Sequence, residues 1–211
     1  MKTQILSIAF VAFASMVVTQ VHAVPIGGVE FPDGAISFAD SVVSYSKGSN
    51  VGSGWDDPNS ALGVPDYPGT NTAVSLGVGG ELVLQFTDNS LTTSGNDDDD
   101  LWIFEIGGVT EYFNVGISTD NSTWIDLGNV LGQPTGIDID SFAGVVQGAF
   151  YSFVRLRDVT PNQSGFPYGE ADIDAVGAIS SAPPVDVPEP GTLVLFGMGL
   201  AGLGLARRRK A

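Results

Sequence analysis

Carboxylate side chains are the groups of this chain that could do chemistry, and the densest run of them is Asn96 to Asp100. Alternate residues of an extended segment face the same way, so Asp98 and Asp100 can share one site. Hard cations such as Ca²⁺ take about six to eight oxygen ligands. The run is therefore interpreted either as a solvated acidic loop, which consecutive like charges usually form, or as a calcium site.

Asp172 and Asp174 form a second acidic pair at the start of an expected strand, where their spacing of two puts them on one face. Two carboxylates on one face repel each other unless a cation joins them or an arginine pairs with them. The pair therefore predicts either a metal ion or pairing with Arg155 and Arg157 on neighbouring strands.

A third acidic set, Asp56, Asp57 and Asp66, lies in a loop rich in glycine and proline. If the three sets converge at one end of the domain, a calcium site follows there. The predicted metal ligands are Asp66, Asp98, Asp100, Asp172 and Asp174.

The expected mature domain lacks the residues that several other kinds of catalysis need. The chain has no cysteine, and its one histidine, His22, lies in an N-terminal segment that we expect to be removed. This excludes Ser-His and Cys-His dyads and histidine-ligated zinc from the mature domain. Paired carboxylates also permit glycoside hydrolysis. A glycoside hydrolase therefore remains as a distant alternative. The expectation is that the protein is not an enzyme.

Trp55, within Gly54–Asp57, is the best candidate for an exposed aromatic platform that stacks on sugar rings. Trp102 lies between apolar neighbours, which favours a place in the core.

The elements that must position these side chains are short strands. Residues 81–86 and 112–118 alternate polar and apolar types, which is typical of strands buried on one face. Further strands are expected at 36–44, 101–106, 124–127, 150–157 and 173–179. Glycine, asparagine, aspartate and proline separate them, and no amphipathic helix is expected between residues 24 and 186. The pattern predicts an all-β fold, an antiparallel β-sandwich over residues 24–180.

The N-terminus has the pattern of a secretory signal peptide over residues 1–23. Lys2 precedes an apolar stretch over residues 5–18, and Val21-His22-Ala23 forms a cleavage site of the small-x-small type. We expect a signal helix cleaved after Ala23, with an uncleaved anchor as the alternative.

The C-terminus combines Val187-Pro188-Glu189-Pro190-Gly191, an apolar segment over 192–206 and the basic cluster Arg207-Arg208-Arg209-Lys210. The apolar segment spans roughly 22 Å as a helix, which is marginal against a hydrocarbon core of roughly 30 Å. We expect a short transmembrane helix that anchors the chain transiently. Basic residues favour the cytoplasmic face, so the rest of the chain lies outside. Residues 181–187 read as a proline-rich spacer.

The domain between these ends is strongly acidic. Taking Lys2, the four basic tail residues and Glu189 from the whole-chain counts leaves 23 acidic and 3 basic residues, a formal charge of −20. This excludes nucleic acid as a partner and favours binding of cations.

Residues 187–191, the apolar segment and the basic cluster together closely resemble the PEP-CTERM sorting signal of Gram-negative bacteria that make extracellular polymeric matrix. The resemblance implies cutting near Pro188-Glu189-Pro190 by an exosortase-type membrane transpeptidase. It implies export, transient anchoring at the inner membrane, and then release or attachment at the cell envelope, surface or matrix.

A second resemblance lies inside the domain. Residues 61–66, 100–105, 115–120 with Trp124, 154–158 and 172–176 are similar to pieces of discoidin-like, or galactose-binding-like, jelly-roll domains. This resemblance implies two packed sheets with loops gathered at one end, where various members bind sugars, lipid head groups or structural calcium.

The expected function is that of an exported cell-surface or extracellular-matrix protein with a non-catalytic adhesive or structural β-sandwich. The close alternative is a calcium-dependent, lectin-like module that binds carbohydrate, with matrix polysaccharide as partner.

Overall fold

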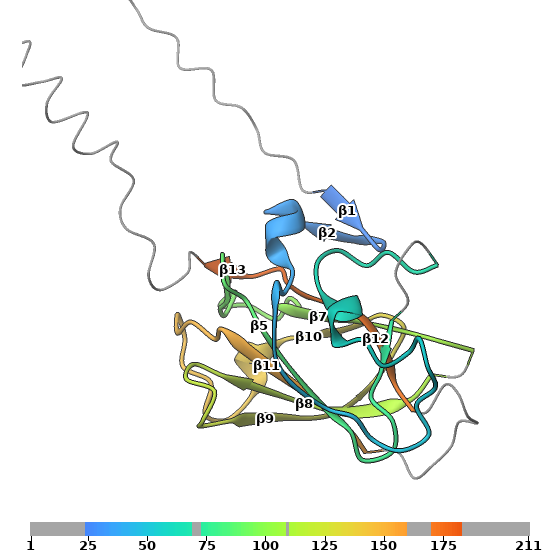
Figure 1. Cartoon of the computed structure of the whole chain (residues 1–211). Coiled ribbons are helices and arrows are strands. Elements are labelled where there is room, and N and C mark those ends of the chain that lie inside the picture. The colour runs from blue at the N-terminus through green and yellow to red at the C-terminus, as the bar shows by residue number, and fades with distance from the viewer. Residues whose placement is uncertain (1–23, 69–72, 109, 160–169, 183–211) are drawn as a thin grey trace, which may run out of the picture.

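The computed structural model describes residues 24–68, 73–108, 110–159 and 170–182 (Figure 1). The predicted signal peptide with Ala23, the short transmembrane helix and the sorting residues 187–191 and 207–210 lie outside these ranges. Within the described residues, no helix has both the length and the apolar character needed to cross a membrane.

Two antiparallel sheets form the body of the domain. The larger sheet has the order β3-β5-β11-β8-β9, and the smaller has the order β10-β7-β12-β4. The larger sheet consists of β3 (Ser41–Ser46), β5 (Glu81–Gln85), β11 (Phe153–Asp158), β8 (Tyr112–Ser118) and β9 (Ile125–Leu131). The smaller consists of β10 (Thr135–Ile137), β7 (Leu101–Ile106), β12 (Asp172–Ala178) and β4 (Val74–Ser75).

Two short pairs complete the strands: β1 (Val24–Ile26) with β2 (Val29–Phe31), and β6 (Ser90–Leu91) with β13 (Ser181–Ala182). Single 3-10 turns lie at Gly34–Ser37 (η1), Pro58–Ala61 (η2) and Ile139–Ser141 (η3). The prediction of an all-β sandwich is confirmed at this level.

The main core lies between the two sheets. Alternate residues of β8, Phe113, Val115 and Ile117, are fully buried, and Leu101 and Ile103 of β7 belong to the same cluster. The alternation read from the sequence thus places one face of each strand inward.

A second apolar cluster covers the outer face of the smaller sheet. Phe31 from the β1–β2 hairpin and Phe38, just after η1, pack on Phe104 of β7 and Ala175 of β12. Figure 1 shows the hairpin and η1 stacked at this side of the sandwich. Strand β12 is therefore buried along its whole length, between two cores.

Several boundaries differ from the sequence prediction, including that of β9, which runs to Leu131 and not to Leu127. The strand expected at 36–44 starts later, because η1 occupies the first positions and β3 begins at Ser41. At the other end, Ser181 and Ala182, assigned to the spacer, instead pair with β6. The folded chain therefore extends beyond residue 180.

Candidate functional site: two groups of carboxylates

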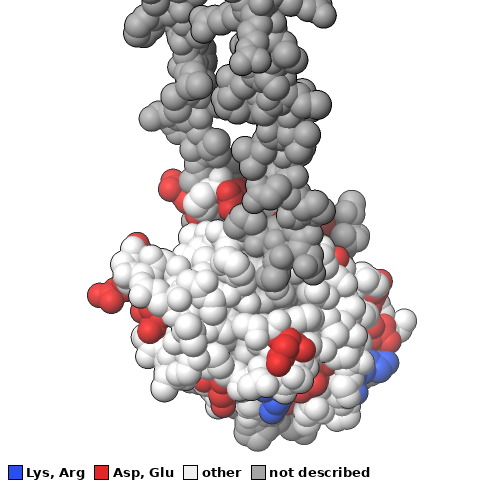
Figure 2. Space-filling view, turned by 90° about the vertical axis from the view of Figure 1, so that its left-hand side faces the viewer, with Lys and Arg blue, Asp and Glu red and all other residues white. Residues whose placement is uncertain are grey.

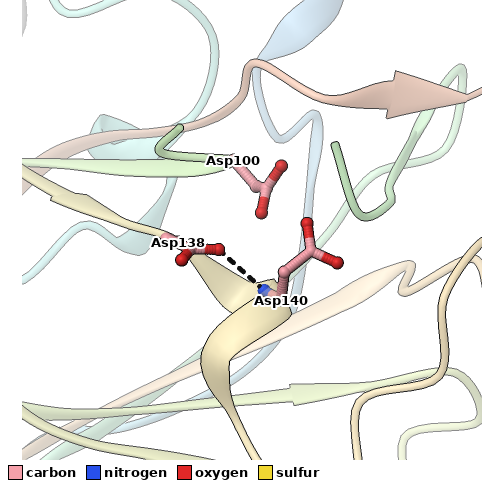
Figure 3. Close-up of side chains that lie close together, drawn as sticks. All are labelled: Asp100, Asp138 and Asp140. Atoms are coloured by element: carbon pink, nitrogen blue, oxygen red, sulfur yellow. Dashed lines mark hydrogen bonds between the residues drawn. The ribbon is translucent and has the colours of Figure 1, made fainter. Parts of the chain in front are cut away.

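Asp100, Asp138 and Asp140 form the tightest carboxylate group among the described residues. One oxygen from each lies within 4.8 Å of the others. Asp100 directly precedes β7, Asp138 follows β10 and Asp140 belongs to η3 (Figure 3). Pairing of β10 with β7 brings the two segments together, and the Asp100 N–H donates to the Ile137 carbonyl at 2.9 Å.

Hydrogen bonds hold all three aspartates in place. Fully buried Asp100 accepts from the N–H of Ser94 at 2.8 Å and of Ile139 at 3.0 Å. Asp140 accepts from the N–H of Gly95 at 2.8 Å, and Asp138 accepts from the N–H of Asp140 at 2.9 Å. The group therefore fixes two loops and also presents oxygens of the kind that bind hard cations.

A shallow depression of about 270 Å³ adjoins this group. Its walls are polar for the most part and come from two loops: Gly95, Asn96, Asp97, Asp140, Val145 and Gln147.

This grouping differs from the predicted pairing of Asp98 with Asp100. Asp98 is exposed and lies outside the group, while Asp138 and Asp140 take its place. The cause is that Asp100 points inward toward Ile139, away from the acidic run. Asp138 and Asp140 are two residues apart in sequence, as are Asp98 and Asp100. This spacing is the sequence feature that could have identified them as candidate ligands.

Two further buried carboxylates lie at the opposite end of β7, on opposite faces of the β7–β12 pair. Glu105 is 2% exposed and Asp172 is 4% exposed, on adjacent strands in which Glu105 pairs with Ile173. Burial raises the pKa of Glu105 to about 8, and the charges of Glu111 and Asp172 add to the rise. Burial also raises the pKa of Asp172 to about 8, with Glu111 adding and the Ser75 hydroxyl opposing.

The three acidic sets do not converge at one end of the domain, so the condition for a shared calcium site is not met. Asp100 and Asp172 lie at opposite ends of the β7–β12 pair, since Leu101 pairs with Ala178 and Ile106 pairs with Asp172. Five residue steps along β7 correspond to roughly 17 Å.

The third set is divided among different partners. Asp56 forms an ion pair with Lys47 at 2.9 Å, and Asp57 accepts from the N–H of Asn59 at 3.0 Å. The N–H of Asp66 donates to Asp174 at 3.5 Å. Of this set, Asp66 is therefore the residue that stays near a predicted ligand.

The alternative of pairing with arginine is also wrong. Arg155 and Arg157 lie on β11 in the larger sheet, whereas Asp172 and Asp174 lie on β12 in the smaller. Arg157 instead pairs with Glu81 of the adjacent β5, with Nε to Oε2 at 2.9 Å.

Asp172 and Asp174 also have different surroundings, because β12 bulges between Ile173 and Ala175. The Ser75 hydroxyl faces Asp172, while Asp174 accepts from the N–H groups of Asp66 and Tyr67. Simple alternation therefore fails at this pair.

The three tryptophans differ in their surroundings. Trp102 packs on the second apolar cluster, as expected. The Trp124 ring lies 4.3 Å below the Arg155 guanidinium carbon. Trp55 is partly buried, so it is less exposed than a free platform, and its main-chain carbonyl accepts from the Ser75 N–H at 2.8 Å.

Comparison with known proteins bears on the C-terminus. Comparison with curated proteins found no match to the chain. The model of the PEP-CTERM protein-sorting motif matches residues 186–210. The chain therefore carries the signal of a secreted precursor that crosses the membrane and is sorted to the cell surface by an exosortase.

Proposed function

We propose that the mature domain is a non-catalytic adhesive or structural module of the cell surface or extracellular matrix. The observation that carries this proposal is the sorting motif at residues 186–210, attached to an acidic β-sandwich. The packing of a five-stranded on a four-stranded antiparallel sheet supports a jelly roll of the discoidin-like kind.

The arrangement of the acids supports a non-catalytic role. Many described aspartates accept main-chain N–H groups and so hold loops in place: Asp40, Asp57, Asp100, Asp120, Asp126, Asp138, Asp140, Asp158 and Asp174. Main-chain N–H donors favour the ionised form of a carboxylate, which makes it a weaker proton acceptor. Figure 2 shows acidic side chains in separate groups over one face, with few basic ones.

Calcium-dependent binding of matrix polysaccharide is the second candidate function. It is favoured by the oxygens of Asp100, Asp138 and Asp140 beside a polar depression. Binding of the protein to a glycan array with and without Ca²⁺ tests this candidate function. A second experiment uses matrix and plant polysaccharides: a binding module is retained on them without cleaving them, whereas a hydrolase cleaves them.

The surface role is tested in a Gram-negative host that has an exosortase, by comparing the full chain with a Pro188-Glu189-Pro190→Ala variant. The expected result is a processed protein accessible to surface labelling, against an unprocessed variant in the membrane fraction. A Pro183-Pro184→Ala variant is the matched control and should be processed normally. Equal surface labelling of all three would contradict the proposal.

Adhesion is tested separately. Cells that lack the protein should hold less matrix than cells that display it. Unchanged matrix retention, with surface display intact, would contradict the adhesive role alone.

A further inference from the structure

A cavity of about 510 Å³ lies where the described chain ends. Its walls come from the start of η1, from the residues before β6 and from β13: Asp33, Ile36, Asp88, Asn89, Ser181 and Ala182. Figure 1 shows η1 and β13 on the side of the sandwich where the β1–β2 hairpin lies. The sorting motif at residues 186–210 therefore begins four residue steps from the wall of this cavity.

The cavity carries negative charge. Asp33 and Asp88 are exposed carboxylates in its walls, and Asp33 precedes η1 without a side-chain hydrogen bond to that turn. Burial raises the pKa of Asp88, and the charge of nearby Asp40 adds to the rise. A cationic group in the cavity would relieve the repulsion between Asp88 and Asp40.

Asn89 adds a buried acceptor to the same walls. It is 2% exposed, and its Nδ2 donates to the Ser181 hydroxyl at 3.2 Å. Its Oδ1 has no hydrogen-bond partner within the described part of the chain. Buried polar groups are normally satisfied, so this oxygen fits a wall that a donor from a partner completes. Ile36 of η1, 53% exposed, offers an apolar contact in the same cavity.

The basic side chains of the domain are used elsewhere. Lys47, Arg155 and Arg157 are the only Lys or Arg residues in the sequence between residues 24 and 182. Lys47 pairs with Asp56, and both arginines face Glu81 on the larger sheet. A cationic group in the cavity can therefore come only from outside the folded domain.

The chain between the cavity and the sorting motif is short. Pro188 lies six residue steps beyond Ala182, and six steps span at most roughly 20 Å. A folded domain of about 100 residues has a radius of gyration of about 13 Å. An exosortase whose active site holds residues 188–190 must therefore lie against the face from which the folded chain leaves, and this cavity opens on that face.

We propose that the cavity is a docking site for the exosortase that processes the chain, and that it receives a Lys or Arg side chain of that enzyme. The proposal rests on the sorting motif and not on the adhesive role proposed above. The short connection brings the enzyme to this face, and the acceptors of Asp33, Asp88 and Asn89 select a cationic donor.

The test is the rate at which the full chain is processed in the host that has an exosortase, followed by pulse labelling and the mobility shift of the precursor. Asp33→Lys with Asp88→Lys should slow processing by about fivefold or more, because the enzyme's cation then meets like charges. The matched control, Asp97→Lys with Asp98→Lys, makes the same change in total charge on another exposed loop. It should change the rate by less than about twofold, because salt screens distant charges.

A longer spacer separates docking from a defect in folding or export. Inserting about twenty Gly and Ser residues between Val185 and Asp186 adds a mean span of roughly 25 Å, so the enzyme need not approach the cavity. In this longer chain, Asp33→Lys with Asp88→Lys should slow processing by less than about twofold, because the enzyme then meets the motif away from the domain. A folding or export defect would instead slow the short and the long chain alike.

Three results would each overturn the proposal: an unchanged rate for Asp33→Lys with Asp88→Lys, equal slowing of the short and the long chain, or equal slowing by the control pair. Failure of the adhesive role gives a different result. In that case matrix retention does not depend on the displayed protein, while processing still depends on Asp33 and Asp88 in the short chain alone.

Discussion

The carboxylate of Asp100 accepts the N–H of Ile139 at 3.0 Å, across 39 positions of sequence, inside the protein. Its other oxygen accepts the N–H of Ser94 at 2.8 Å. One buried aspartate thus ties the loop before β7 to the η3 turn. In a domain without cysteine, such bonds hold loops that disulfides hold in many other small exported domains.

Asp100→Ala is therefore expected to destabilise the domain by about 2–4 kcal/mol, because it leaves two main-chain N–H groups without their buried acceptor. Denaturant unfolding of the purified protein measures the change. Asp98→Ala, at an exposed position of the same acidic run, is the matched control and should stay within about 0.5 kcal/mol of wild type. Equal losses for the two variants would show that the run acts only through its total charge.

Asp120 provides a test of pH dependence. It accepts from the N–H groups of Thr123 and Ser122, both at 2.8 Å, and these bonds hold the pKa of its carboxyl well below the usual range. A carboxyl with a lowered folded-state pKa stabilises the fold above its unfolded pKa, near 4, and this contribution is lost as the pH falls toward the folded-state pKa.

Asp120→Asn should therefore be less stable than wild type at pH 6, and the difference should shrink steadily below about pH 4, where wild-type Asp120 begins to lose its charge. Chemical unfolding at a series of pH values measures it. A difference that stays constant down to pH 2 would mean that the charge of Asp120 makes no contribution.

Local alternation predicted the strands that have one buried face. The bounds expected for β7 and β8 agree with the structure, since polar and apolar residues alternate cleanly along 112–118 and aromatic and aliphatic residues mark 101–106. The strand expected at 36–44 was misplaced because Phe38 is buried by a contact outside the sheets, in the second apolar cluster. Apolar character alone does not distinguish these two kinds of burial.

The carboxylate groups could be predicted only in part. Asp100 and Asp172 were identified from local spacing, but Asp138 and Asp140 join Asp100 through the pairing of β10 with β7. Glu105 was missed because it lies in a strand that reads as apolar, with no acidic neighbour in sequence. Its position opposite Ile173 is set by the β7–β12 register, which a single sequence does not reveal.

Close packing at Gly177 gives a prediction for the second apolar cluster. A Cβ built there would lie 2.8 Å from a ring carbon of Phe31 and 2.9 Å from one of Phe38. Gly177→Ala should therefore cost about 1–3 kcal/mol, because the rings must move in a packed site. Gly108→Ala, where a Cβ meets nothing within 4 Å, is the control for thermal unfolding. A Tm for Gly177→Ala as high as that of the control would mean that the β1–β2 hairpin yields freely.

Trp55 gives the prediction that bears most directly on carbohydrate binding. Trp55 keeps part of its surface exposed, while the ring of Trp124 is covered by the Arg155 guanidinium and is less able to stack on a sugar. If the domain retains polysaccharide, Trp55→Ala should weaken retention in an affinity gel by about tenfold, which corresponds to one lost stacking contact of about 1.4 kcal/mol. Trp124→Ala should change retention by less than about twofold. Retention that is unchanged in Trp55→Ala, with Ca²⁺ present and the fold intact, would remove Trp55 as a ligand contact and leave the adhesive role to other surfaces of the sandwich.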